Sequence, residues 1–143
     1  MFINIIILGT LVLASISDIK NKTVPMWMII IPSLVSLASS AYRIIFGIKD
    51  VTEIGYSLIP GLFLILIAFI ARGAMGYGDG IMLMAVAPAF GVEKVCFGLM
   101  LALFLSAASS IILLIVKKAG RHTSLPFIPF LTIGLGGASI AFL

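Results

Sequence analysis

The sequence has little charge and almost no cysteine. Only 10% of its 143 residues are Asp, Glu, Lys or Arg, whereas 62% are hydrophobic, and the mean hydropathy is +1.33. Soluble domains carry about 25% charged residues, so this composition excludes a soluble globular domain, a disordered chain and an ordinary nucleic-acid-binding protein. The single cysteine, Cys96, lies in an apolar run, which excludes an internal disulfide and a cysteine-based zinc cluster.

Long apolar runs account for most of the chain. Six of them are delimited by charges, Gly or Pro, at roughly 2–17, 25–42, 54–71, 80–92, 95–116 and 125–143. A membrane-spanning helix needs roughly 20 apolar residues, and none of the runs shows the alternation of a barrel strand. The sequence therefore predicts an all-α, polytopic integral membrane protein with about six transmembrane helices in one bundle. Residues 1–143 are expected to form one domain.

The basic residues predict how the bundle is oriented. The net charge of +4 is interpreted as an orientation signal and not as a nucleic-acid surface, because Lys and Arg collect in cytoplasmic loops. The first, third and fifth joints between the runs hold six basic residues, and the second and fourth hold three. The two sets are Lys20, Lys22, Arg72, Lys117, Lys118 and Arg121, against Arg43, Lys49 and Lys94. The first set is expected in the cytoplasm, with both termini outside.

Two of the five acidic residues stand apart from the others. Asp50, Glu53 and Glu93 fall in joints assigned to the outside and are interpreted as solvated loop charges. Asp18 and Asp79 instead lie at the ends of short apolar runs, on the same predicted face of the membrane. An ionisable group near the hydrocarbon is a functional hypothesis by default. Two neighbouring carboxylates cannot both ionise cheaply, so one keeps a proton while the other acts as a base.

Glycines surround the second of these aspartates, in the stretch Arg72-Gly-Ala-Met-Gly-Tyr-Gly-Asp-Gly80. Glycine permits a close approach of another backbone. One interpretation is a loop, with Gly76, Tyr77, Gly78 and Gly80, against which an extended substrate lies beside Asp79. The alternatives are a flexible connector, or small residues that allow tight helix packing.

Three motifs resemble those of one known family. Gly76-Tyr77-Gly78-Asp79 matches the GxGD motif of membrane aspartic proteases. The stretch Asp18–Pro25 resembles the motif that ends the first span of type IV prepilin peptidases, and Leu125–Leu131 resembles their proline-rich entry into the last span. The resemblance covers essentially the whole chain, with the motifs in the same order.

The resemblance implies a membrane aspartic endopeptidase of a prokaryotic cell membrane. Such an enzyme removes the short basic leader of type IV prepilins or related pseudopilins at the cytoplasmic face, and it needs no metal or other cofactor for this proteolysis. Asp18 and Asp79 match its catalytic pair. The chain has Ile81 where the family often carries a lysine. It also lacks room for the paired-cysteine insertion, so it resembles the short, peptidase-only form without a zinc or N-methyltransferase domain.

Other functions remain as alternatives. A small proton- or cation-coupled transporter or channel subunit also uses paired acids, but it favours acids nearer the bilayer midplane. A presenilin-like intramembrane protease usually has a Tyr-Asp pair within a span, which Ser17-Asp18 does not match. A structural assembly subunit is a third alternative. The expected partners are prepilin-like substrates and the lipid bilayer, with no nucleic acid, and no oligomeric state is predicted.

Overall fold

The computed structural model describes residues 2–21, 25–48, 50–70, 76–116 and 126–142. All regular secondary structure within these ranges is helical, which confirms the predicted all-α class. The six helices found there are α1 (Phe2–Asn21), α2 (Trp27–Ile45), α3 (Val51–Ile70), α4 (Tyr77–Phe90), α5 (Val92–Ile115) and α6 (Ile128–Ala141).

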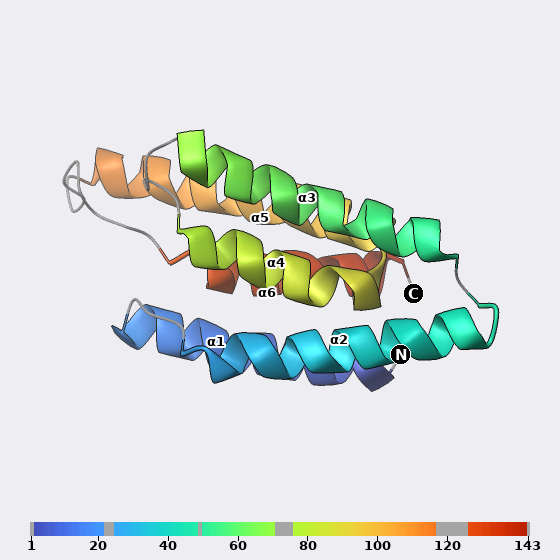
Figure 1. Ribbon diagram of the computed structural model, residues 1–143. Helices are drawn as coiled ribbons and strands as arrows, with labels where there is room; N and C mark the ends of the chain where they lie inside the picture. Colours follow the sequence, from blue (N-terminus) through green and yellow to red (C-terminus); the bar gives the residue numbers. More distant parts are fainter. Residues whose placement is uncertain (1, 22–24, 49, 71–75, 117–125, 143) are drawn as a thin grey trace.

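The helices lie side by side, and consecutive helices run in opposite directions (Figure 1). Helices α1, α3 and α5 therefore end where α2, α4 and α6 begin, and we call this the Asp18 end of the bundle. The chain termini lie at the other end, which we call the termini end (Figure 1). This alternation places the last residues of α1, α3 and α5 at one end of the bundle with the first residues of α2, α4 and α6.

Four of the described helices are long and apolar enough to cross a membrane, namely α1, α2, α3 and α5. Helices α4 and α6 have 14 residues each, or about 21 Å at 1.5 Å per residue. The hydrocarbon core of a bilayer is about 30 Å thick. The structure thus agrees with a polytopic helical membrane protein, but it gives full spanning length to four helices and not to all six.

Several helix boundaries differ from those predicted, because polar residues continue the helices beyond the apolar runs. Helix α1 extends to Asn21, so Asp18 lies inside it. Helix α4 begins at Tyr77, within the expected glycine loop. Glu93, predicted to lie in a loop, belongs to the first turn of α5. Only Gly91 separates α4 from α5, and its φ of 85° lies in the region that glycine adopts without strain.

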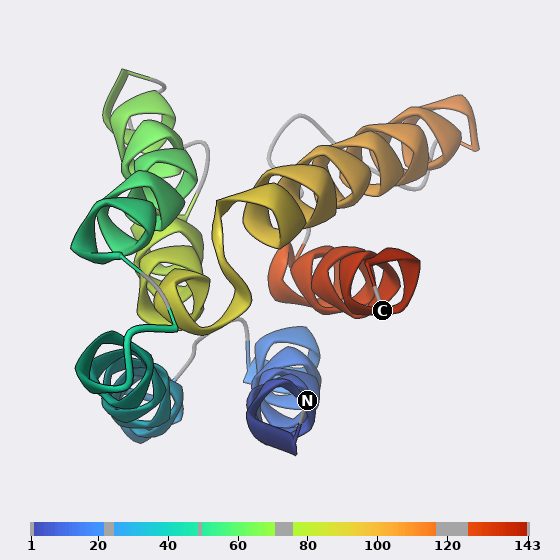
Figure 2. The ribbon, with the colours of Figure 1, turned by 90° about the vertical axis from the view of Figure 1, so that its right-hand side faces the viewer.

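Helix α4 occupies the centre of one half of the bundle. It packs against α2, α3 and α5 and also contacts α1. Viewed along the bundle, α4 lies between α3 and α2, and α6 lies between α5 and α1 (Figure 2). A helix that is apolar on all sides is typical of such an enclosed position. Its buried apolar side chains are Met82, Leu83, Val86, Ala87, Ala89 and Phe90.

Glycines bring two helix pairs into backbone contact. In the α3–α4 pair, a Cβ atom at Gly80 would lie 2.5 Å from Cγ1 of Ile65 and 3.3 Å from the carbonyl oxygen of Gly61. In the α5–α6 pair, a Cβ atom at Gly134 would overlap the carbonyl oxygen of Gly98. Small residues at helix contacts let apolar helices approach closely, which strengthens their van der Waals packing in a membrane.

We expect Gly134→Ala to destabilise the protein by about 1–3 kcal/mol, because the added methyl group must push α5 and α6 apart. Gly9→Ala is the matched control, since a Cβ atom at Gly9 meets nothing within 4 Å. Alanine is favoured over glycine inside a helix by roughly 0.5–1 kcal/mol, so the control should be at least as stable as the original protein. Unfolding in detergent, followed by circular dichroism, measures both. Equal stability of the two variants would contradict the glycine contact.

Candidate active site

Asp18 lies in the last turn of α1, and its side chain is only 9% exposed. Its carboxyl group accepts a hydrogen bond from the backbone N–H of Ile128, the first residue of α6. The first N–H groups of a helix have no partner within the helix, so Asp18 satisfies one of them. The Oδ2 atom of Asp18 is buried and has no hydrogen-bond partner among the described residues. One carboxylate oxygen is therefore left for another partner.

Asp79 lies in the first turn of α4 and is partly buried. The helix starts there because Gly76 is extended, with φ −68° and ψ 125°, and its carbonyl oxygen accepts a 3.1 Å hydrogen bond from the N–H of Asp79. An acidic side chain near a helix N-terminus is stabilised by the helix dipole, typically by 0.3–1 kcal/mol. The turn thus places the carboxyl group of Asp79 at the start of α4.

The fold brings these two aspartates together, although 61 positions separate them in the chain. Helices α1 and α4 are in contact, and both aspartates lie at the Asp18 end of the bundle (Figure 1). Their carboxylates are close enough to repel each other electrostatically. The other three acids, Asp50, Glu53 and Glu93, are exposed. Asp18 and Asp79 are thus the two acids at the Asp18 end, and their catalytic role stays a prediction.

The remaining motif residues have different surroundings. A Cβ atom at Gly76 would lie 3.1 Å from Oδ2 of Asp79, so the carboxylate folds back over this glycine. Gly80 is buried in the α3–α4 contact, as the packing interpretation requires. Tyr77 is 45% exposed, and a Cβ atom at Gly78 would meet nothing within 4 Å. The rest of the expected loop, residues 71–75, lies outside the described residues.

The C-terminal end of α4 is hydrogen-bonded to polar side chains of α2. The hydroxyl oxygen of Ser36 accepts a 3.1 Å hydrogen bond from the N–H of Ala89, and Nη1 of Arg43 donates one of 3.1 Å to the Ala89 carbonyl. Pro88 precedes this residue, and proline disturbs the backbone hydrogen bonding of its own helix. Sequence reasoning had assigned Arg43 to a loop and missed this contact.

Sequence reasoning also missed the contribution of α6 to the surroundings of Asp18. The sequence stretch around Pro129 was noticed only through its resemblance to a known motif. Pro129 is the second residue of α6, and a proline so close to a helix start is a recognisable signal of a helix N-terminus. That signal predicts free N–H donors near residue 128, but not that Asp18 accepts from one of them.

The described residues hold no group of three or more His, Cys, Asp or Glu side chains that could bind a metal ion. Within these ranges the candidate site consists of the two carboxyl groups, the N–H of Ile128 and Gly76 beside Asp79. This set of groups is suited to moving protons.

Comparison with known families gives one match. A sequence profile of the type IV leader peptidase family matches residues 5–117, which is well over half of the chain and includes both Asp18 and Asp79. Searches among curated proteins and among solved structures gave no significant match.

The proximity of the two aspartates is open to a direct test. In a Cys96→Ser background, the double variant Asp18→Cys, Asp79→Cys should be joined by a short bis-maleimide, because its two side chains start from neighbouring helix ends. The control pair Asp18→Cys, Thr52→Cys should stay unlinked, since α3 begins at the termini end. Mass spectrometry of digested protein identifies the cross-linked peptides. Equal yields from the two pairs would refute the arrangement.

Proposed function

Because the chain belongs to the type IV leader peptidase family, we propose that it is an aspartic endopeptidase in which Asp18 and Asp79 activate water. The observation that carries this proposal is the meeting of the two carboxylates at the ends of α1 and α4. Asp18 is held there by the N–H of Ile128, and its other oxygen has no partner among the described residues.

In the proposed reaction, one of the two carboxyl groups acts as a general base and the other as a general acid. One carboxylate takes a proton from a water molecule, and the water oxygen attacks the carbonyl carbon of the scissile peptide bond. The other carboxyl, in its protonated form, hydrogen-bonds to the carbonyl oxygen. The carbon–nitrogen bond then breaks as a proton passes to the leaving amine. Two like charges held close together favour this shared-proton state.

The depth of the pair supports cleavage near the membrane surface. Asp18 lies three residues before the end of α1, and Asp79 lies two residues after the start of α4. At 1.5 Å per residue, these positions are about 3–5 Å from the helix ends. A transporter or a presenilin-like protease favours acids deeper in the bilayer, so the position argues for the leader peptidase.

The proposed substrates are type IV prepilins or prepilin-like proteins, cut after their short basic leader. The side of the membrane is proposed from charge, because six of the nine basic residues belong to the first, third and fifth joints of the sequence, and basic joints collect in the cytoplasm in membrane proteins. We therefore propose a multi-pass protein of the cell membrane of a prokaryote, with the Asp18 end in the cytoplasm and both termini outside. Residues 1–143 would form a single peptidase domain.

Each of the variants Asp18→Asn and Asp79→Asn should lose leader cleavage by a factor of about 10²–10⁴, the usual contribution of a general acid or base. The double variant should be no slower than either single one, because the two groups act as a unit. The assay mixes purified protein in detergent with prepilins from the same genome. Asp50→Asn, an exposed acid outside the pair, is the control and should cleave normally. Rapid cleavage by either single variant would rule out the carboxylate pair.

Gly76→Ala should lower kcat by roughly tenfold with little change in protein yield. The added methyl group would lie 3.1 Å from the Asp79 carboxylate and displace it by a few tenths of an ångström, and catalysis is sensitive to such shifts. The matched control is Gly55→Ala, because a Cβ atom at Gly55 meets nothing within 4 Å. Should both variants cleave at the original rate, Gly76 does not position Asp79.

A further inference from the structure

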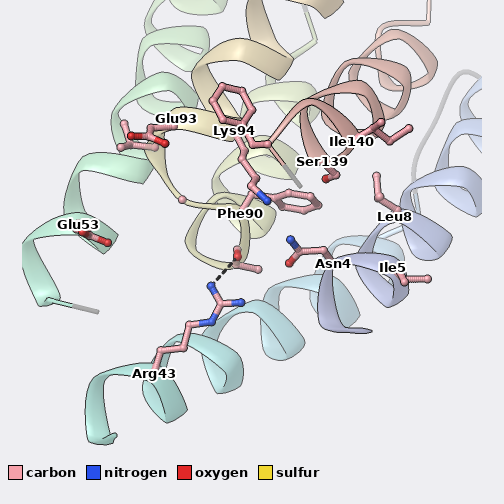
Figure 3. A pocket seen from close by; sticks show the side chains of 15 residues that line it. Asn4, Ile5, Leu8, Arg43, Glu53, Phe90, Glu93, Lys94, Ser139 and Ile140 are labelled. Carbon is pink, nitrogen blue, oxygen red and sulfur yellow. Dashed lines mark hydrogen bonds between the residues drawn. The ribbon is translucent and has the colours of Figure 1, made fainter. Parts of the chain in front are cut away.

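A cavity lies at the termini end of the bundle (Figure 3), whereas Asp18 and Asp79 lie at the opposite end. It is a cavity of about 800 Å³, within the range of about 300–1,000 Å³ that ligand pockets have. The turn between α4 and α5 forms one wall, and residues of α1, α2, α3 and α6 complete it. The proposed peptidase reaction does not use this cavity.

One part of the cavity offers donors to an anion. Helix α5 starts there at its N-cap residue Gly91, which has no side chain that could cap the helix. The first N–H groups of α5 are thus without partners in the helix, and such a helix start favours phosphate. The side chain of Lys94 reaches toward Phe90 in the cavity wall, and Arg43 approaches from α2 (Figure 3). These groups form a site suited to a phosphate group.

A neighbouring part of the cavity offers acceptors to a cation. Asn4 and Ser139 line the cavity, and the Oδ1 atom of Asn4 and the Oγ atom of Ser139 are buried without a hydrogen-bond partner among the described residues. Leaving a buried acceptor without a hydrogen bond is unfavourable. A ligand with N–H donors would therefore be stabilised by hydrogen bonds to these two oxygen atoms. Glu53 and Glu93 also line the cavity and balance its two basic residues. A zwitterion therefore fits better than a purely anionic ligand.

The third part of the wall is apolar. Ile5 of α1 is 57% exposed and Ile140 of α6 is 74% exposed. These two side chains and Leu8 lie on the opposite side of Phe90 from Glu53 and Glu93 (Figure 3). Exposed apolar side chains on membrane helices face lipid, so the cavity joins its polar groups to a surface for acyl chains.

We propose that this cavity binds one phospholipid whose headgroup carries a phosphate and a primary ammonium, as in phosphatidylethanolamine. The phosphate contacts Lys94, Arg43 and the start of α5, and the ammonium donates to Asn4 and Ser139. The glycerol and acyl chains follow Ile5 and Ile140 into the bilayer. This site is independent of the peptidase function and of which face of the membrane it occupies.

Native mass spectrometry of the detergent-purified full chain with an equimolar lipid mixture tests the proposal. Phosphatidylethanolamine should be retained at one molecule per chain, at least about tenfold above phosphatidylcholine and phosphatidylglycerol. Phosphatidylcholine has the same charges but no N–H donors for Asn4 and Ser139, and phosphatidylglycerol has the phosphate without the ammonium. No retained lipid, or equal retention of either competitor, overturns the proposal.

Substitutions of residues that line the cavity test whether the lipid binds there. Lys94→Gln and Asn4→Ala should each weaken phosphatidylethanolamine retention by about tenfold or more, because each removes a hydrogen bond to a charged group. The matched controls are Lys20→Gln and Asn21→Ala, at the Asp18 end of α1, which should retain the lipid normally. Circular dichroism identifies the variants that fold. Normal retention by a folded Lys94→Gln or Asn4→Ala protein, or equal loss in the controls, overturns the assignment.

Discussion

Helix α4 is enclosed by α2, α3 and α5, and this enclosure holds Asp79 in place. Near the start of the helix, Gly80 lets α3 approach to backbone contact. Near its end, the backbone of Ala89 is hydrogen-bonded on both sides to polar side chains of α2. A helix fixed at both ends has little freedom to slide or rotate, so the carboxylate in its first turn has a defined position against α1. The candidate catalytic pair depends on that fixed position.

The two proposed sites share one structural feature, which is the shortness of α4 and α6. A helix of about 21 Å leaves about 9 Å of a bilayer core of about 30 Å uncovered. Polar backbone at membrane depth is tolerated only where protein buries it or where it lines a cavity. At one end of the bundle, the starts of α4 and α6 meet Asp18. At the other end, the turn after α4 forms the wall of the cavity. Each proposed site thus lies at an end of a helix that is shorter than the bilayer core.

The two ends differ in their chemistry. At the Asp18 end, two carboxylates repel each other, and one of them keeps an oxygen without a partner among the described residues. Such a pair is suited to proton transfer with water. At the termini end, basic and acidic side chains occur in equal numbers around buried amide and hydroxyl oxygens. This balance is suited to holding a zwitterion, because each charge of the ligand finds an opposite charge or a dipole.

The sequence by itself determined the helical membrane fold, because apolar runs of this length have no other stable arrangement in a bilayer. It also determined that Asp18 and Asp79 share one end, because consecutive spans alternate in direction. The helix boundaries and the separate roles of Gly76 and Gly80 were decided only by the tertiary structure. The hydrogen bond from Ile128 to Asp18 joins residues 110 positions apart, and the α4–α5 wall of the cavity lies more than 80 positions from the α1 residues that line it. Such contacts depend on how whole helices pack, and local hydropathy and motif spacing do not contain that information.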